Sequence, residues 1–239
     1  MASQGDSVRW YADKKAWRLL RKNVMVEGDR DVRYFELADR LYWEKYRRRL
    51  IGEDLSILSA GTGDHGGTDG VFEEFPTLVK LIQTDCDNQG KTLFRVVALL
   101  DNDRAGRSLA EVLVQRYRGM RHCRDVFLLN RALPRTSSEP TVLFKQIKSA
   151  NSAWKSIDCE IEDLVGAGLL DAFISEMPNA LARQTTEAGG YRHYEWHDNA
   201  KSRLVLFTKE HAMIEDVGGI IETLKSIRFY LALDPDGAN

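Results

Sequence analysis

Short apolar runs along the chain alternate with longer segments whose apolar residues recur at helical spacing. The runs predict four β-strands, at residues 24–26, 55–58, 93–100 and 126–129. The run 93–100 is apolar except at Arg95 and does not alternate with polar residues, which is typical of a strand buried on both faces of a parallel sheet. Alternation of strands and helices therefore predicts an α/β fold, a parallel sheet flanked by helices.

Helices are predicted between these strands, at 8–23, from Asp29 to about Arg48, from Glu73 to about Thr84, and at 104–118. Asp29 is the expected N-cap of the second helix, and the glycine-rich segment 61–70 is expected to be a loop. The predicted packing residues are Trp10, Trp17, Leu19, Leu20, Val32, Phe35, Leu37, Leu41, Trp43, Leu109, Val112 and Leu113.

The pattern changes after about Ala132. We expect a polar, loop-rich stretch at 131–156, a helix from Ile161 to Met177, and a mixed stretch at 180–203. Residues 204–207 fit a strand or a buried helix turn, and 210–233 looks mainly helical with a weak point at Gly218-Gly219. The chain thus divides into an N-terminal helical extension (1–23), a core (24–150) and a mainly helical C-terminal part that completes the site (151–239).

Composition narrows the class of protein. The 239 residues are 43% hydrophobic and carry a formal net charge of −2, which neither demands nor excludes a nucleic-acid partner. No apolar run of about 18 residues is present, so no membrane span is expected, and Met1 to Ser7 lacks the apolar core of a signal peptide. Three dispersed cysteines, Cys86, Cys123 and Cys159, fit a reducing cytoplasm.

Acidic residues follow two of the predicted strands. Glu27-Gly28 follows the first, and Asp101-Asn102-Asp103-Arg104-Ala105-Gly106 follows the third. Ligands of parallel sheets bind beyond the carboxyl ends of the strands, so these acids are expected to share one cleft. Magnesium prefers a few carboxylates with retained water molecules. The pattern therefore predicts a divalent-cation site, which Asp31, one helical turn beyond Glu27, would join.

This pair of motifs resembles the TOPRIM family, the catalytic domain shared by topoisomerases, bacterial primases and OLD-like nucleases. The family has Glu-Gly after its first strand and Asp-x-Asp-x-x-Gly after a later strand, with a similar separation. The resemblance covers roughly residues 22–130 and implies a TOPRIM-like (Rossmann-like) parallel sheet, with 24–150 as the catalytic core.

Two further features resemble the OLD-like, antiphage-associated nuclease branch. Asp31 stands where that branch commonly has an additional metal-binding acid, and residues 158–164 resemble its Ile-Glu-Asp-type segment. The resemblance implies that Glu162 binds a second metal ion, with Glu160 and Asp163 as weaker candidates. It also implies a lysine near the cations, for which Lys209 or Lys201 is the candidate.

The activity implied is hydrolysis of phosphodiester bonds in DNA or RNA with two Mg²⁺ (or Mn²⁺) ions, held about 3.5–4 Å apart. The expected metal ligands are Glu27, Asp31, Asp101, Asp103 and Glu162. The expected catalytic residues are Glu27, Asp101, Asp103 and Lys209, with Arg104 steadying a non-reacting phosphate. The sequence has no G-x-x-x-x-G-K-[ST] loop, primase-type zinc module or topoisomerase tyrosine domain. The resemblance implies a setting in bacterial antiphage defence, with an ATPase or reverse-transcriptase partner protein.

Other interpretations stay open. The same acids would serve a primase-like nucleotidyltransferase, or persist in a catalytically silent binding or regulatory subunit. Asp29, Asp31, Glu162 and Lys209 also have a structural explanation, as a helix cap or as solvated helix residues. Arg47-Arg48-Arg49 suits a helix end as well as nucleic acid, and His65 with its loop suits phosphate or plain solvent. His193 and His197 have the spacing of zinc ligands on a helix, against which Gly189-Gly190 argues.

Overall fold

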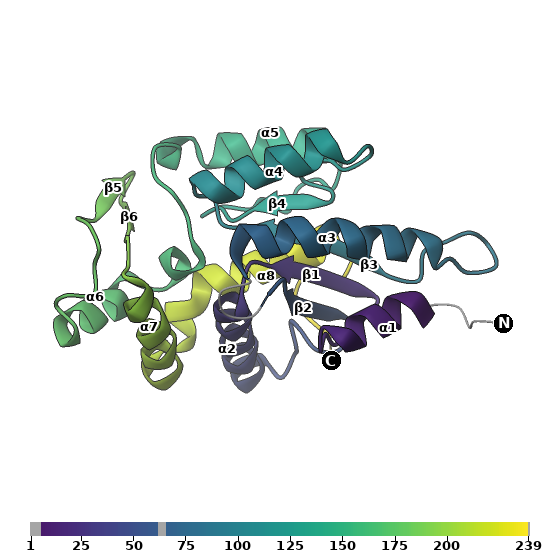
Figure 1. Ribbon diagram of the computed structural model, residues 1–239. Coiled ribbons are helices and arrows are strands. Elements are labelled where there is room, and N and C mark those ends of the chain that lie inside the picture. Colours follow the sequence, from purple (N-terminus) through teal and green to yellow (C-terminus); the bar gives the residue numbers. More distant parts are fainter. Residues whose placement is uncertain (1–5, 62–65, 239) are drawn as a thin grey trace.

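The computed structural model describes residues 6–61 and 66–238, which form an α/β fold on a four-stranded parallel sheet (Figure 1). The strands are β1 (Lys22–Val26), β2 (Leu55–Ser59), β3 (Arg95–Leu100) and β4 (Val126–Leu128), in the spatial order β2-β1-β3-β4. All three pairings are parallel. The predicted fold class and the four predicted strands are confirmed.

The register of the sheet brings the ends of the two central strands together. On β1, Lys22 pairs with Arg95 of β3, and Met25 pairs with Ala98. The two strands therefore end at nearly the same level, and the residues that follow them emerge at the same edge of the sheet. Sequence order alone does not give this placement, because β2 lies between β1 and β3 in the chain and outside them in space.

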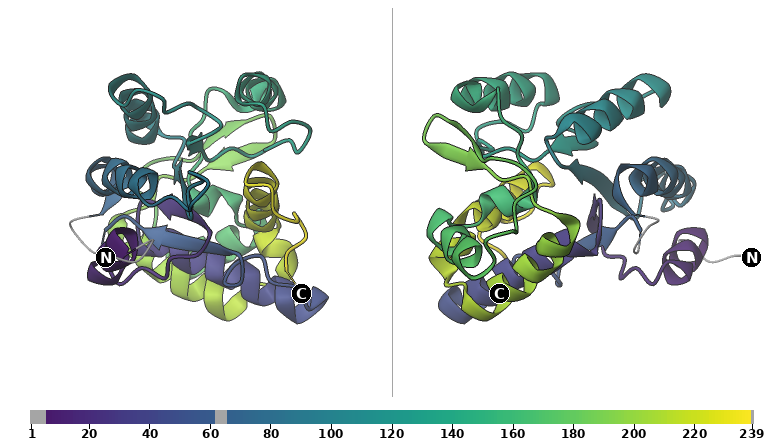
Figure 2. Two further views of the ribbon diagram at one scale, coloured as in Figure 1. Left: turned by 90° about the vertical axis from the view of Figure 1, so that its right-hand side faces the viewer. Right: turned by 60° about the vertical axis from the view of Figure 1, so that its left-hand side comes forward.

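Helices cover both faces of the sheet (Figure 2), and alternating strand residues pack into two different hydrophobic clusters. Val24 and Val97 pack with α2 (Asp29–Tyr46) and α8 (Gly218–Tyr230) in one hydrophobic cluster. Met25 and Ala98 belong to a second cluster on the opposite face. The helices of that second face are α1 (Asp6–Lys14), α3 (Gly67–Thr84) and α4 (Arg104–Arg116).

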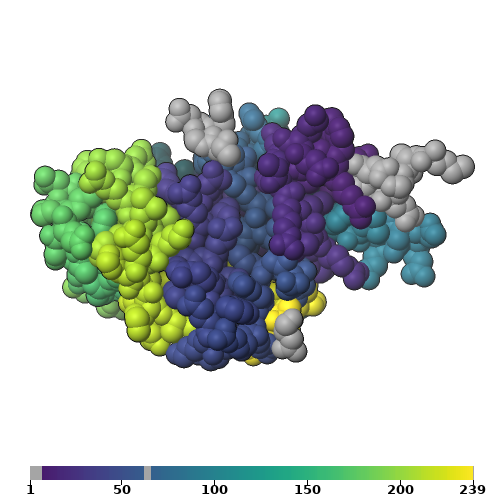
Figure 3. Space-filling view, turned by 90° about the horizontal axis from the view of Figure 1, so that it is seen from below, coloured from purple at the N-terminus to yellow at the C-terminus, as the bar shows by residue number. Residues whose placement is uncertain are grey.

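The chain beyond β4 is mainly helical, as predicted. Its elements are α5 (Pro140–Ala150), 3₁₀ turns at Ser152–Trp154 and Ile161–Leu164, α6 (Ala167–Glu176), the hairpin β5 (Thr186–Ala188) and β6 (Tyr191–His193), α7 (Asp198–His211), a 3₁₀ turn at Ile214–Val217, and α8. This part packs on the same face of the sheet as α2. Figure 3 shows α2 and α7 side by side on the underside of the molecule.

Several predicted helix boundaries are wrong. The first helix ends at Lys14 rather than at residue 23, because Ala16 adopts a left-handed conformation with φ of 54°. Trp10, expected to pack, is 62% exposed. Helix α3 begins at Gly67, within the predicted loop, and not at Glu73. Trp43 and Val112 are also exposed on their helices.

The predicted loop at 131–156 is also wrong, because it contains α5. Both carboxylate oxygens of Glu139 accept hydrogen bonds from the first backbone N–H groups of this helix, and Pro140 occupies its first position. Leu143 and Ile147, one turn apart, are buried beneath it. The helix predicted over 161–177 is interrupted at Gly166.

The ambiguous run 204–207 is part of helix α7, and Gly218-Gly219 marks the start of α8. Over residues 6–61 and 66–238, no helix combines the length and the hydropathy that crossing a membrane requires.

Candidate active site

The end of β1 is tied directly to the end of β3. The Glu27 carboxylate accepts a hydrogen bond from the Asp101 N–H at 3.1 Å. Gly28, not Asp29, is the N-cap of α2, and Asp31 accepts a hydrogen bond from the Gly28 N–H at 2.9 Å. The predicted capping role of Asp29 is therefore wrong, since Asp29 is an exposed residue of the first turn. This arrangement turns Glu27 and Asp31 toward the same edge as Asp101.

The Asp-x-Asp-x-x-Gly turn after β3 has a clear geometric basis. Asp103 caps α4 by accepting a hydrogen bond from the Gly106 N–H at 2.7 Å. A Cβ atom added at Gly106 would lie 2.0 Å from the Asp101 carbonyl oxygen, so only glycine permits this close approach. Arg104, in the first turn of α4, is exposed.

A backbone bridge carries a third acidic segment to this edge. Asn102 and Cys159 exchange two backbone hydrogen bonds, at 2.9 and 3.2 Å. The segment continues into the 3₁₀ turn that holds Glu162, which is only 3% exposed. Residues from β1, β3 and the region after α5 thus meet at one edge, as the sequence predicted for Glu27, Asp101 and Glu162.

Asp163, a weaker ligand candidate, instead organises this turn. Its carboxylate accepts hydrogen bonds from the Glu160 N–H at 2.8 Å and the Tyr194 N–H at 3.2 Å, and contacts His193 Nδ1 at 2.8 Å. Burial alone would lower the pKa of His193, but the hydrogen bond and charge of Asp163 outweigh it and raise that pKa. Asp163 therefore fixes the backbone that carries Glu160 and Glu162.

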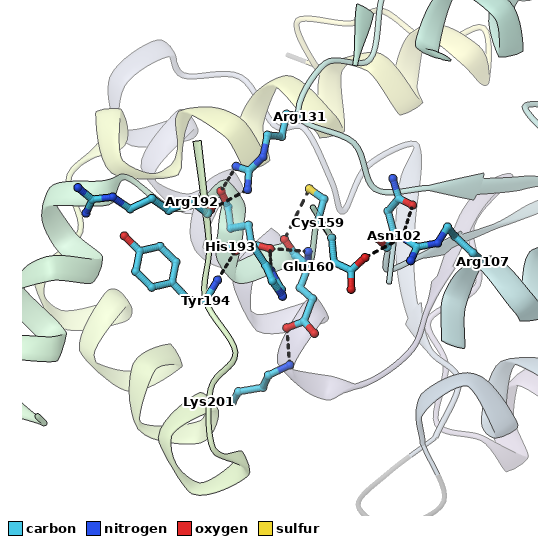
Figure 4. Close-up of polar contacts among 11 residues, drawn as sticks. Asn102, Arg107, Arg131, Cys159, Glu160, Arg192, His193, Tyr194 and Lys201 are labelled. Atoms are coloured by element: carbon cyan, nitrogen blue, oxygen red, sulfur yellow. Dashed lines mark hydrogen bonds and ion pairs between the residues drawn. The ribbon is translucent and has the colours of Figure 1, made fainter. Parts of the chain in front are cut away.

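The lysine that reaches the acids is Lys201 of α7, which pairs with Glu160 (Figure 4). Burial would lower the pKa of Lys201, but Glu162 and Glu160 raise it, so this lysine stays charged. Lys209 is not brought to the cluster. It is exposed in the last turn of α7, where its carbonyl accepts a hydrogen bond from Arg40.

Arg30 is a site residue that the sequence analysis missed. Its Nη1 atom is buried and has no hydrogen-bond partner among the described residues. Its charge lowers the pKa of Asp31, and its Nη2 atom lies 3.9 Å from Asp198 Oδ1 at the start of α7. No motif distinguishes Arg30 from the chain's other arginines, although its position three residues after Glu27 was an available signal.

The acids of this edge, hereafter the carboxylate cluster, are Glu27, Asp31, Asp101, Asp103, Glu160 and Glu162. Burial, then the charge of Asp31, raises the pKa of Glu27 to about 7. Burial, then Asp31 and Glu27, raises the pKa of Asp101 well above its usual value.

Burial likewise raises the pKa of Glu162 to about 7 and that of Asp31 to about 6, although Lys201 opposes both shifts. Six carboxylates thus lie beside two cations, Lys201 and Arg30, and a divalent cation would stabilise the ionised acids.

The donor set suits Mg²⁺ or Mn²⁺, since every candidate ligand is a carboxylate oxygen. As the side chains stand, however, no three His, Cys, Asp or Glu residues in the described part of the chain are placed to hold one ion together. Hydrogen bonds occupy one oxygen each of Glu27, Asp103 and Glu160. Cation binding would therefore require side-chain rotation, with the other oxygens available.

Other candidates from the sequence fall elsewhere. His193 ends β6 and His197 precedes α7, so they do not share a helix, and the zinc spacing has no structural basis. Arg48 pairs with Asp234, and Arg49 pairs with Asp39, so both stabilise the fold. His65 lies outside the described residues.

Comparison with known proteins gives no family assignment: no family model, no curated protein and no solved structure matches this chain significantly.

Proposed function

We propose that this protein is a nuclease that depends on Mg²⁺ or Mn²⁺ and hydrolyses phosphodiester bonds of DNA or RNA. The observation that carries the proposal is the carboxylate cluster, in which acids from three separate segments meet at the sheet edge and remain under-neutralised. The motifs Glu27-Gly28 and Asp101 to Gly106 resemble those of TOPRIM nucleases of the OLD-like branch, and this supports the same chemistry.

The position of each acid in the carboxylate cluster indicates the role that it would have. Asp101, Asp31 and Glu162 would be the principal cation ligands, with Glu27 and Asp103 completing the set through their free oxygens. When bound, the cations lower the pKa of a water molecule and stabilise charge on phosphate oxygens. Glu27 is held by the Asp101 N–H through one oxygen, so its other oxygen is placed to accept a proton from the attacking water.

Two cationic side chains would bind the substrate's phosphate. Lys201 lies at the cluster and stays charged, so in this proposal it takes the part that the sequence suggested for Lys209. The buried Nη1 of Arg30 lacks a partner, and a phosphate oxygen would satisfy it. Both would stabilise the charge that develops during phosphoryl transfer.

The direct test is cleavage of end-labelled DNA and RNA with Mg²⁺ or Mn²⁺. Asp101→Asn combined with Asp103→Asn is expected to lower the cleavage rate by about 10³-fold or more, because it removes charge that the cations need. Glu36→Gln combined with Glu210→Gln is the matched control, since both residues are exposed on α2 and α7 away from the cluster. Full activity in the Asp101/Asp103 variant would refute the proposal.

The same preparation separates the alternatives. A primase-like nucleotidyltransferase would extend oligonucleotides only when nucleoside triphosphates are supplied, without cleaving the labelled strands. A catalytically silent subunit would take up no Mn²⁺ in a calorimetric titration. Either result would replace the nuclease proposal.

A further inference from the structure

A hollow of about 300 Å³ lies next to the carboxylate cluster, across the bridge between Asn102 and Cys159. The side chains of Asn102 and Cys159 line it, whereas their neighbours Asp101 and Glu160 belong to the cluster. Successive side chains of an extended segment point to opposite sides. The hollow and the cluster therefore lie on opposite sides of the bridge, and residues that are adjacent in the chain contribute to each. The hollow is hereafter called the bridge pocket.

The walls of the bridge pocket combine apolar, aromatic and basic groups. Two aromatic side chains contribute, Phe144, which is 44% exposed, and Trp154, which is half-buried. Apolar side chains come from Leu128, Ile147 and Ile157, and a polar one from Asn130. The basic residues of the wall are Arg107, Arg131, Lys148 and Lys155. Four cations beside an acidic cluster provide the positive charge that a polyanionic substrate needs.

The cations of the pocket differ in availability. Arg107 pairs with Asp158, and Arg131 donates to the backbone carbonyls of Asp163 and Arg192 (Figure 4). Lys148 and Lys155 are exposed and make no ion pair within the described part of the chain. These two lysines are therefore free to contact a ligand's phosphates.

Trp154 is held in a fixed orientation. Its Nε1 donates to the Gly189 carbonyl at 3.1 Å, and its ring lies 4.8 Å from that of Tyr191 at 76°. A Cβ atom at Gly189 would come within 2.6 Å of Nε1, so the β5–β6 hairpin rests directly on the ring edge. A fixed aromatic ring at the wall of a pocket is a suitable platform for stacking.

We propose that the bridge pocket binds one unpaired nucleotide of single-stranded DNA or RNA, next to the phosphate that is cleaved. This inference rests on the proposed nuclease function, for which it names the substrate class. The volume lies at the lower end of small-ligand pockets, which suits a single base and its sugar. A paired base would have to leave its duplex to enter, at an energetic cost.

Base identity is not read strongly in this pocket. Asn102 and Asn130 hydrogen-bond to each other, and Asn130 also donates to the Leu128 carbonyl. Arg107 donates to the Asn102 carbonyl oxygens. Because these polar groups are already engaged, stacking rather than hydrogen bonding would hold the base, and stacking is tolerant of sequence.

A larger hollow, of about 480 Å³, is also lined by basic residues but lies at the opposite end of the sheet from the carboxylate cluster. Its lining includes Lys80, Arg118 and Arg124, and the Arg124 carbonyl accepts a hydrogen bond from Arg95 at the start of β3. Asp101 follows the opposite end of that strand. This second hollow provides a matched control, since it has similar charge without proximity to the cluster.

The test is the binding of fluorescent oligonucleotides of about 12 nucleotides, measured by anisotropy with Mg²⁺ in an Asp101→Asn background. Single strands of dT and of rU are compared with a duplex of equal length. We expect single strands to bind at least ~10-fold more tightly than the duplex, because only they offer an unpaired base. The dT and rU arms distinguish DNA from RNA.

Substitutions then locate the contact. Lys148→Ala with Lys155→Ala is expected to weaken single-strand binding about 10-fold. The slope of log K against log salt concentration should become shallower by about 1.4, because each lost phosphate contact changes it by about 0.7. Lys80→Ala with Arg118→Ala removes equal charge from the control hollow and should change neither. Trp154→Ala is expected to weaken binding at least ~5-fold, and Trp154→Phe to restore most of it.

Three outcomes would overturn the inference: a duplex bound as tightly as single strands, equal losses in the Lys148/Lys155 variant and the Lys80/Arg118 control, or no loss in Trp154→Ala. Thermal melting of each variant shows whether it is folded, and Trp154→Phe guards against a merely structural loss. If the native chain cleaves nucleic acid while the pocket variants bind normally, the pocket assignment fails and the nuclease stands. If the pocket variants lose binding but the native chain never cleaves, the nuclease proposal fails and the pocket stands.

Discussion

Two regions of this molecule bury charge, and they handle it in opposite ways. At the corner between α2, β2 and α8, Arg228 is fully buried and makes a two-pronged ion pair with Asp54. It also donates to the carbonyls of Leu50 and Asp234. At the carboxylate cluster, six acids face Lys201 and Arg30, and burial raises the pKa values of Glu27, Asp31, Asp101 and Glu162. In the first region, groups of the protein itself neutralise and hydrogen-bond the buried charge. In the second region, the carboxylates outnumber the nearby cations.

This difference separates a structural role from the functional role that we propose for the carboxylate cluster. A buried charge whose hydrogen bonds are satisfied contributes to one defined arrangement of the fold. A group of buried acids without enough counter-charge lowers stability, so its presence calls for another explanation, such as a bound cation. Asp39 gives the same contrast, because it accepts hydrogen bonds from the Leu50 and Ile51 N–H groups and pairs with Arg49.

The largest expected effect comes from breaking the satisfied region. Asp54→Ala would leave the guanidinium of Arg228 buried without its carboxylate, and we expect a loss of about 2–4 kcal/mol in the free energy of unfolding. Urea denaturation measures this. Glu53→Ala, at the exposed neighbouring position, is the control and should change stability by less than ~0.5 kcal/mol. Equal stability of the two variants would mean that the ion pair contributes nothing.

A smaller effect is expected when a cation is supplied to the unsatisfied region. Mn²⁺ at about 100 times its dissociation constant should raise the free energy of unfolding by about 2.7 kcal/mol at pH 8. The gain should shrink at pH 5.5, where protons compete for the same carboxylates. Thermal melting at both pH values measures it. A gain that persists in Asp101→Asn/Asp103→Asn would place the cation elsewhere.

The smallest effect concerns pH without any cation. Burial raises the pKa of Glu162 from about 4.5 to about 7. The folded chain therefore binds more protons than the unfolded chain in this window, and the stability that this group contributes falls as pH rises from about 4.5 to 7. Glu162→Gln lacks this loss. Relative to the native chain, it should gain about 1–2 kcal/mol between pH 5 and pH 8.

Chemical denaturation of both proteins at the two pH values tests this, with Glu210→Gln as an exposed control. If the difference in the free energy of unfolding between Glu162→Gln and the native chain does not change with pH, then folding does not raise the pKa of Glu162.

The sheet was predictable because its strands are short, apolar and bounded by turn residues. β3 is the clearest case, since continuous burial leaves no other interpretation of Val96 to Leu100. The convergence of Glu27 with Asp101 followed from the rule that parallel strands end at one edge. The boundaries between loops and helices were harder to predict from the sequence. The start of α3 lies in a glycine-rich segment, and the capping of α5 depends on a glutamate, which is not among the strongly preferred caps.

The choice of lysine could not be predicted for a different reason. Lys201 and Lys209 lie two turns apart on one helix, so the sequence pattern presents them alike. What distinguishes them is the contact of Lys201 with Glu160, a residue of a distant segment. The same holds for Arg30, whose Nη1 atom is buried where α2 packs against α7. Local pattern predicts elements, whereas such contacts depend on packing.

The hydrogen bonds between Asn102 and Cys159 have a consequence for the timing of synthesis. They join the end of β3 to a segment that the ribosome adds much later, and Lys201 is added later still. While the chain is being made, the edge of the sheet therefore first displays Glu27, Asp31 and Asp101 without their late partners. On the proposed function, a growing chain would carry no complete centre near the ribosome's own RNA until the segment with Lys201 had been added and folded.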